Sequence, residues 1–304
     1  MNQAAIDIGS NSILLLIVDA DGQVLEESVR IVGLGKGLGD RGLFQPKQME
    51  AAMNAMMEFA QRVRAFGIPT WMVQVVATSA ARRAMNAQAF TQRIREKTGF
   101  RVQIISGEDE ARLTWAGARG GLNLPNGPTV VIDLGGGSTE FAMGDEDQLH
   151  MRVSKELGAV RLTEAFFGTA PRRYRPHDMA RLRDHIHAEL ASLQWPTIPR
   201  TLIAVAGTAT TLAAMERGLT VWDRDIVHGM KLRRAAIRKW IDKLLSSTPS
   251  ERKEWASVSP ARADYILAGA MVLEEACTVS HRDSMVISDG GVRHGLLMTA
   301  ELGN

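Results

Sequence analysis

The stretch Val130-Val131-Ile132-Asp133-Leu134-Gly135-Gly136-Gly137-Ser138-Thr139-Glu140-Phe141 organises the rest of the chain. Its apolar start predicts a buried strand, three glycines break that strand, and Phe141-Ala142-Met143 predicts a second one. Glycines in a tight turn leave backbone N–H groups uncovered, and such a concavity can grip phosphate oxygens. Asp133 and Glu140 flank the turn, and Mg²⁺ prefers carboxylate ligands when it also holds a phosphate. A hairpin with a glycine-rich bulge explains the glycines alone, but not the two acids.

The same pattern occurs near the N-terminus, where Asp7 takes the place of Asp133. Residues 6–12 predict a strand and a small-residue turn, and Ile13 to Val18 predicts a second buried strand. In both copies a polar turn, a further strand and a Leu-Gly pair follow. A repeat of this kind predicts two similar α/β domains, each of which contributes one phosphate-gripping turn to a shared cleft.

The clearest linker is Asn123 to Pro128, so we expect one domain at residues 1–124 and a second at 125–304. The last helix of the second domain can pack back toward the first domain. Residues 37–42 match the dinucleotide fingerprint GxGxxG, but Leu43 to Pro46 follow instead of a helix. We therefore reject a dinucleotide site.

Length and composition fit a two-domain globular protein: the chain has 304 residues, of which 45% are hydrophobic and 23% charged. The single cysteine, Cys277, excludes an internal disulfide framework and lies in an apolar helical stretch, which favours a buried structural thiol. Neither a signal peptide nor a membrane span is evident, so we expect a cytoplasmic protein without a membrane partner.

The net charge of +2 argues against a protein that coats nucleic acid, and we expect no nucleic-acid partner. The charge is uneven, however. Arg172-Arg173-Tyr174-Arg175, followed by His177, Arg181 and Arg183, forms a basic cluster that suits a polyanionic ligand, although a solvated helix face explains it equally well.

Three other positions suggest a site. Arg82 follows the strand that ends near Ala77, where ligand sites of α/β proteins gather. Capping explains Ser106 and Asp109 at the start of the next helix but leaves Glu110 unexplained, although an acid in a first helical turn also interacts favourably with the helix dipole. Gly207-Thr208 leads from a strand into a helix, whose N-terminus is either an anion site or a threonine-capped end.

Together these motifs resemble the Ppx/GppA phosphatase family, the exopolyphosphatases and guanosine pentaphosphate phosphatases of the actin-like, Hsp70 and hexokinase superfamily. The matching pieces, in the family's order, are DIGSNS (7–12), ATSAAR (77–82), SGEDEARL (106–113), DLGGGSTE (133–140), LGAVRLTE (157–164), AGTATTLAA (206–214), VHGMKL (227–232) and SDGGVRHGLL (288–297).

The resemblance implies an α/β fold of two ribonuclease-H-like domains around a central cleft. It implies that Glu110 is the general base, that Arg82 contacts phosphate, and that Asp133 and Glu140 organise Mg²⁺ (or Mn²⁺) and the attacking water. The backbone amides that would cradle the phosphate chain are those of Asn11, Ser12, Gly135, Gly136, Gly137, Ser138, Gly207 and Thr208.

The expected function is hydrolysis of the terminal phosphoanhydride of inorganic polyphosphate, with guanosine pentaphosphate as the alternative substrate. There are two rival classes: a kinase of the same superfamily, and a non-catalytic regulator that binds polyphosphate or nucleotides. Neither class gives a role to all three of Glu110, Asp133 and Glu140. The resemblance also implies a homodimer. The chain looks like the short two-domain form of the family, from which we expect a preference for shorter polyphosphate.

Overall fold

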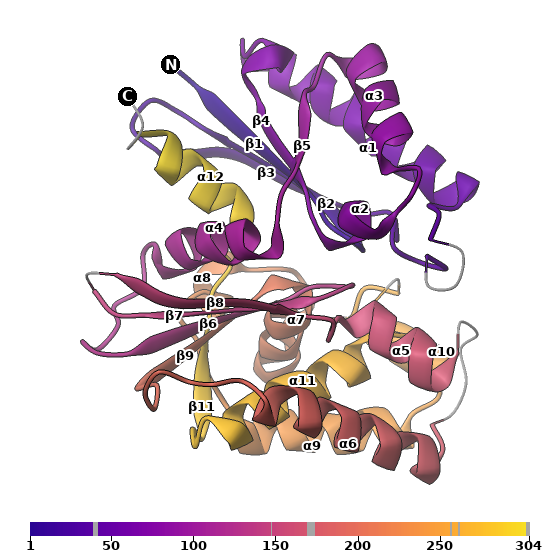
Figure 1. The fold of residues 1–304 in the computed structure, drawn as a ribbon, viewed down its shortest axis with the longest axis vertical. Helices are drawn as coiled ribbons and strands as arrows, with labels where there is room; N and C mark the ends of the chain where they lie inside the picture. The colour runs from indigo at the N-terminus through magenta and orange to yellow at the C-terminus, as the bar shows by residue number, and fades with distance from the viewer. Residues whose placement is uncertain (39–41, 147, 169–173, 256, 261, 302–304) are drawn as a thin grey trace. The chain divides into compact units, whose positions relative to one another are not determined.

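The computed structural model describes residues 1–38, 42–146, 148–168, 174–255, 257–260 and 262–301. The chain divides into two compact units (Figure 1). The first consists of Met1–Gly117 and helix α12 (Val292–Glu301), and the second is Ala118–Gly291. The boundary expected between residues 124 and 125 falls within the span of the second unit.

The first unit is built on a five-stranded sheet of order β3-β2-β1-β4-β5. β1 runs antiparallel to β2 and β2 to β3, whereas β4 and β5 continue parallel to β1. The strands are β1 (Gln3–Ile8), β2 (Ser12–Val18), β3 (Val24–Ile31), β4 (Gln74–Ala77) and β5 (Val102–Ile104).

Helices cover both faces of this sheet because side chains alternate along its strands (Figure 1). Ile6 and Ile8 pack with α1 (Pro46–Ala65) and α3 (Ala87–Thr98), while Ala5 packs on the other face with α12 and α4 (Gly107–Arg119). Two short helices, η1 (Thr70–Met72) and α2 (Ser79–Arg83), flank β4.

The second unit repeats this architecture. Its six-stranded sheet has the order β10-β11-β9-β6-β7-β8, so β8-β7-β6-β9-β11 corresponds to β3-β2-β1-β4-β5, and β10 adds an antiparallel edge. The strands are β6 (Thr129–Leu134), β7 (Thr139–Gly144), β8 (Leu149–Lys155), β9 (Thr201–Val205), β10 (Lys231–Arg233) and β11 (Ser284–Ile287). The repeated order confirms the predicted fold of two ribonuclease-H-like units.

The helices of the second unit, except α10, contribute buried residues to one large apolar core that they share with its sheet. They are α5 (Ala159–Phe167), α6 (Pro176–Ala191), α7 (Ala206–Arg217), α8 (Arg224–Val227), α9 (Arg234–Ser246), α10 (Pro249–Lys253) and α11 (Ile266–Val279). α11 is buried from Ile266 to Cys277, and burial raises the pKa of the Cys277 thiol to about 12, so this cysteine is a structural thiol as predicted. In the described ranges no helix combines the length and hydropathy that crossing a membrane requires.

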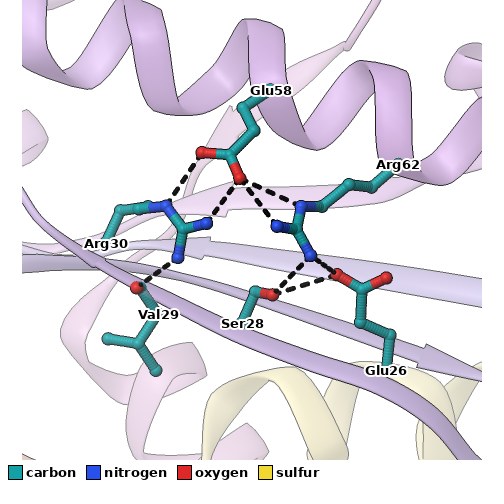
Figure 2. Close-up of polar contacts among 6 residues, drawn as sticks. All are labelled: Glu26, Ser28, Val29, Arg30, Glu58 and Arg62. Atoms are coloured by element: carbon teal, nitrogen blue, oxygen red, sulfur yellow. Dashed lines mark hydrogen bonds and ion pairs between the residues drawn. The ribbon is translucent and has the colours of Figure 1, made fainter.

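An ion network ties the edge strand β3 to α1 (Figure 2). Glu58 of α1 accepts hydrogen bonds from Arg30 Nε of β3 (2.8 Å) and from Arg62 Nε of its own helix (3.0 Å). Arg62 also pairs with Glu26 of β3. Charged side chains on an edge strand discourage pairing with another chain, so the network both fastens α1 and protects the sheet edge.

Candidate active site

Backbone hydrogen bonds from the start of α5 support the glycine turn between β6 and β7. The Gly135 amide donates to the Ser138 carbonyl (3.0 Å), which closes the turn. The amides of Ala159 and Val160 donate to the carbonyls of Gly135 (3.0 Å) and Gly136 (2.9 Å). Within the described residues, the amides of Gly136 and Gly137 have no hydrogen-bond acceptor. The carbonyls of Gly135 and Gly136 are therefore occupied, while the amides of Gly136 and Gly137 lack a protein acceptor in the described ranges, as in a backbone concavity that can bind an anion.

The two acids beside this turn lie on one face of the sheet. Asp133 of β6 stands directly opposite Glu140 of β7 in the antiparallel register, so their side chains are neighbours. Glu140 is 1% exposed, and its Oε1 accepts hydrogen bonds from the hydroxyls of Ser138 and Ser154, each at 2.7 Å. The structure thus brings together the two carboxylates that the sequence predicted.

The turn of the first unit has the same geometry with different chemistry. The Gly9 amide donates to the Ser12 carbonyl (3.0 Å), as Gly135 does to Ser138, and the Gly35 amide donates to the Ser10 carbonyl (2.7 Å). Asp7 is paired with Leu14, however, at the position where Asp133 meets Glu140. Only the second copy carries two facing acids.

Glu110 and Arg82 form a partly buried ion pair in the first unit. Arg82 Nη1 of α2 donates to Glu110 Oε2 of α4 (2.7 Å) and to the Ile105 carbonyl (3.1 Å). Glu110 is only 7% exposed. Ser106 caps α4, since its Oγ accepts from the Asp109 amide (3.0 Å), so capping accounts for its neighbours but not for Glu110, as predicted.

The turn from β9 into α7 carries backbone strain. Ala206 has a φ of +68°, which is unfavourable for a residue with a Cβ, and strained residues of this kind gather at functional sites. Gly207 and Thr208 follow in the first turn of α7, whose N-cap is Val205 without any side-chain hydrogen bond. The alternative interpretation of a threonine-capped helix is therefore wrong.

Sequence reasoning missed Arg262, whose guanidinium lies over Gly207. A Cβ on Gly207 would come within 2.7 Å of Arg262 Cζ. Arg262 Nη1 donates to Thr211 Oγ1 (3.3 Å), and burial lowers the pKa of Arg262. Among the described residues no carboxylate pairs with this arginine. The one feature of the sequence that could have singled out Arg262 is its positive charge a few residues before the apolar helix α11.

The basic cluster is described only in part, because Arg172 and Arg173 lie outside the described residues. Of the remainder, the Arg181 guanidinium lies over the Phe166 ring at 5.7 Å, and Arg183 approaches Glu274 of α11 at 3.8 Å. Both arginines thus have partners within the second unit, and a polyanion-binding role of the cluster stays a prediction.

The fold and these turns define an α/β protein of the actin-like superfamily, with an acid-flanked glycine turn in its second unit. Residues 16–303 match the sequence profile of the Ppx/GppA phosphatase family. The chain is 32% identical to Exopolyphosphatase 2 of Mycobacterium tuberculosis over 97% of both chains. The chain therefore belongs to the Ppx/GppA phosphatase family.

Solved structures agree with this assignment. The crystal structure of the Ppx/GppA family member of Aquifex aeolicus is 32% identical, with a TM-score of 0.83 over 99% of this chain and 98% of that one. The structure of an exopolyphosphatase from Cytophaga hutchinsonii is 25% identical, with a TM-score of 0.91 over 100% of this chain and 98% of that one.

Proposed function

We propose that this protein is an exopolyphosphatase, which hydrolyses the terminal phosphoanhydride of inorganic polyphosphate and releases orthophosphate. The observation that carries the proposal is the glycine turn of the second unit, where two available amides adjoin two facing carboxylates. Phosphoryl transfer depends mainly on positioning and charge neutralisation, and this turn offers both. The likeness to a mycobacterial exopolyphosphatase over 97% of both chains supports polyphosphate as the substrate.

Asp133 and Glu140 fit a divalent cation, Mg²⁺ or Mn²⁺. Two carboxylates directly opposite each other on one sheet face repel, and a cation held between them would relieve that repulsion. Mg²⁺ is usually held by one or two carboxylates together with substrate phosphate, and the described residues offer no cluster of three or more ligands. The ion would neutralise charge on the phosphate oxygens. Asp133 and Glu140 would hold it beside the amides of the turn.

Glu110 is the proposed general base, and Arg82 orients it. A base must point its carboxylate at the water it deprotonates, and the hydrogen bond from Arg82 fixes the direction of Glu110 Oε2. Arg82 also brings a positive charge that attracts a phosphate oxygen. The two residues, taken from separate motifs of the sequence, would therefore act as one unit.

Arg262 and the turn at Gly207 and Thr208 are proposed to bind a further phosphate of the chain. A buried guanidinium without a carboxylate partner beside a helix N-terminus concentrates positive charge, which an anion would neutralise. This reading makes Arg262 a binding residue, whereas Glu110, Asp133 and Glu140 serve the reaction.

The experiment that tests the proposal compares phosphate release from polyphosphate, guanosine pentaphosphate and ATP in the presence of Mg²⁺. We expect the highest kcat/KM on polyphosphate, with orthophosphate as the product. A higher kcat/KM on guanosine pentaphosphate would replace the proposed substrate with the alternative one. Phosphate transfer from ATP to an added acceptor would contradict hydrolysis altogether.

A further inference from the structure

Ser154 of β8 belongs to a row of polar side chains that crosses three neighbouring strands. In the register of the sheet, Asp133 of β6 stands opposite Glu140 of β7, and Glu140 stands opposite Ser154 of β8. Residues opposite each other in antiparallel strands point to the same face. The row Asp133-Glu140-Ser154 therefore lies on one face of the sheet, beside the glycine turn.

The hydroxyls of Ser154 and Ser138 together fix the orientation of the Glu140 carboxylate. Both hydroxyls donate to the same oxygen, Oε1, at 2.7 Å, one from the glycine turn and one from β8. Hydrogen bonds to a carboxylate are short and stronger than those between neutral groups. Two such bonds from different segments leave this buried side chain little freedom to rotate.

Neutral donors suit a carboxylate that has to bind a cation. A lysine or arginine in the place of Ser154 would also orient Glu140, but its charge would repel the cation. A serine hydroxyl orients the carboxylate and leaves its negative charge in place.

The first unit provides an internal comparison. The corresponding row there is Asp7-Leu14-Val29, in which neither the second acid nor the hydroxyl is present. The acid and the hydroxyl thus occur together in one copy of the repeat and are both absent from the other.

We propose that Ser154 is a positioning residue, which holds Glu140 in the orientation that a divalent cation shared with Asp133 requires. This inference rests on the proposed function of Asp133 and Glu140. Ser154 contacts neither substrate nor cation itself, and it acts through Glu140.

The test measures Mn²⁺ binding directly, by the loss of the electron paramagnetic resonance signal of free Mn²⁺, in Ser154→Ala, Ser154→Thr and Glu140→Gln. Losing one hydrogen bond to a charged group should weaken Mn²⁺ binding about tenfold in Ser154→Ala. The Mg²⁺ concentration for half-maximal phosphate release should rise by a similar factor. Ser154→Thr keeps the hydroxyl and should restore most of the affinity.

Ser192→Ala is the matched control. The Ser192 hydroxyl accepts a hydrogen bond from Lys155 Nζ (2.8 Å), so this variant removes a neighbouring hydroxyl that does not reach Glu140. It should bind Mn²⁺ like the unaltered protein. Thermal unfolding of every variant separates a weakened fold from a misplaced carboxylate.

Two results would overturn different claims. If Ser154→Ala binds Mn²⁺ normally while Glu140→Gln loses binding, Ser154 has no positioning role and the proposed cation site stands. If Glu140→Gln itself binds Mn²⁺ and releases phosphate normally, the proposed cation site fails, and the role of Ser154 fails with it. A loss of affinity in Ser154→Thr equal to that in Ser154→Ala would also contradict positioning by the hydroxyl.

Discussion

Gly158 belongs to the candidate site although it has no side chain. A Cβ at this position would lie 2.3 Å from the carbonyl carbon of Gly137 and 2.4 Å from the carbonyl carbon and oxygen of Gly136. These are backbone atoms of the glycine turn between β6 and β7, so they cannot move aside as a flexible side chain can. The glycine of the Leu157-Gly158 pair is therefore required by close packing between α5 and the turn.

We predict that Gly158→Ala displaces the glycine turn. Overpacking of this kind costs about 1 to 3 kcal/mol of stability, and the displaced amides should lower phosphate release more than the loss of stability explains. Thermal unfolding and kcat measured on the same preparation separate the two effects. Gly291→Ala is the control, because a Cβ there meets nothing within 4 Å. Unchanged activity in Gly158→Ala would show that the turn tolerates displacement.

At the scale of single residues, the sequence singled out candidate acids, but it did not predict which hydrogen bonds hold their side chains. Glu110 stood out because capping explained its neighbours and not Glu110 itself. Its bond to Arg82 could not be predicted, because it depends on how α2 and α4 pack. Ser154 was missed because only the register between β7 and β8 places its hydroxyl opposite Glu140.

At the scale of elements, long-range contacts override local helix preference after Arg82. The local sequence pattern favours one helix from this region to about Gly99, but the structure has α2 and α3 separated at Ala84 to Asn86. The Met85 amide donates to the Gly42 carbonyl (2.8 Å), and the Asn86 side chain bonds both the amide and the carbonyl of Phe44. Contacts with residues so distant in the sequence cannot be read from a local window.

The network between β3 and α1 gives a prediction about pH. Hydrogen bonds from Arg30, followed by those from Arg62, lower the pKa of Glu58 below its ordinary value of 4.5. A lowered folded-state pKa means that the network stabilises the protein fully above that ordinary value, and that this contribution is lost as the pH falls through the folded-state pKa. Since Glu58 is about a third exposed, we expect less than about 1 kcal/mol.

The measurement is the free energy of unfolding of the protein and of Glu58→Gln, at neutral pH and at a pH below the folded-state pKa. The difference between the two proteins should shrink at the lower pH and in high salt. Glu50→Gln, on the same helix, should show no such change. A difference independent of pH would mean that packing, not charge, accounts for the effect of Glu58.

At the scale of the whole molecule, the repeat was predictable from the sequence because its signal lies in the order of short motifs. An aspartate at the end of a strand, a small-residue turn and a later Leu-Gly pair occur twice, and both copies adopt the same strand order. Among the described residues of the first unit, the edge strand β10 has no counterpart, and the sequence did not predict this strand. Its three residues, Lys231 to Arg233, are too few to give a strand pattern.

In the proposed reaction, Glu110 is the general base for the hydrolysis of polyphosphate. The most direct test compares Glu110→Gln with the unaltered protein in phosphate release and in polyphosphate binding, with Glu108→Gln as a control in the same helical turn. We predict that Glu110→Gln binds polyphosphate with similar affinity but turns over at least about a hundredfold more slowly, while Glu108→Gln behaves normally. Turnover by Glu110→Gln close to that of the unaltered protein would show that Glu110 is not the general base.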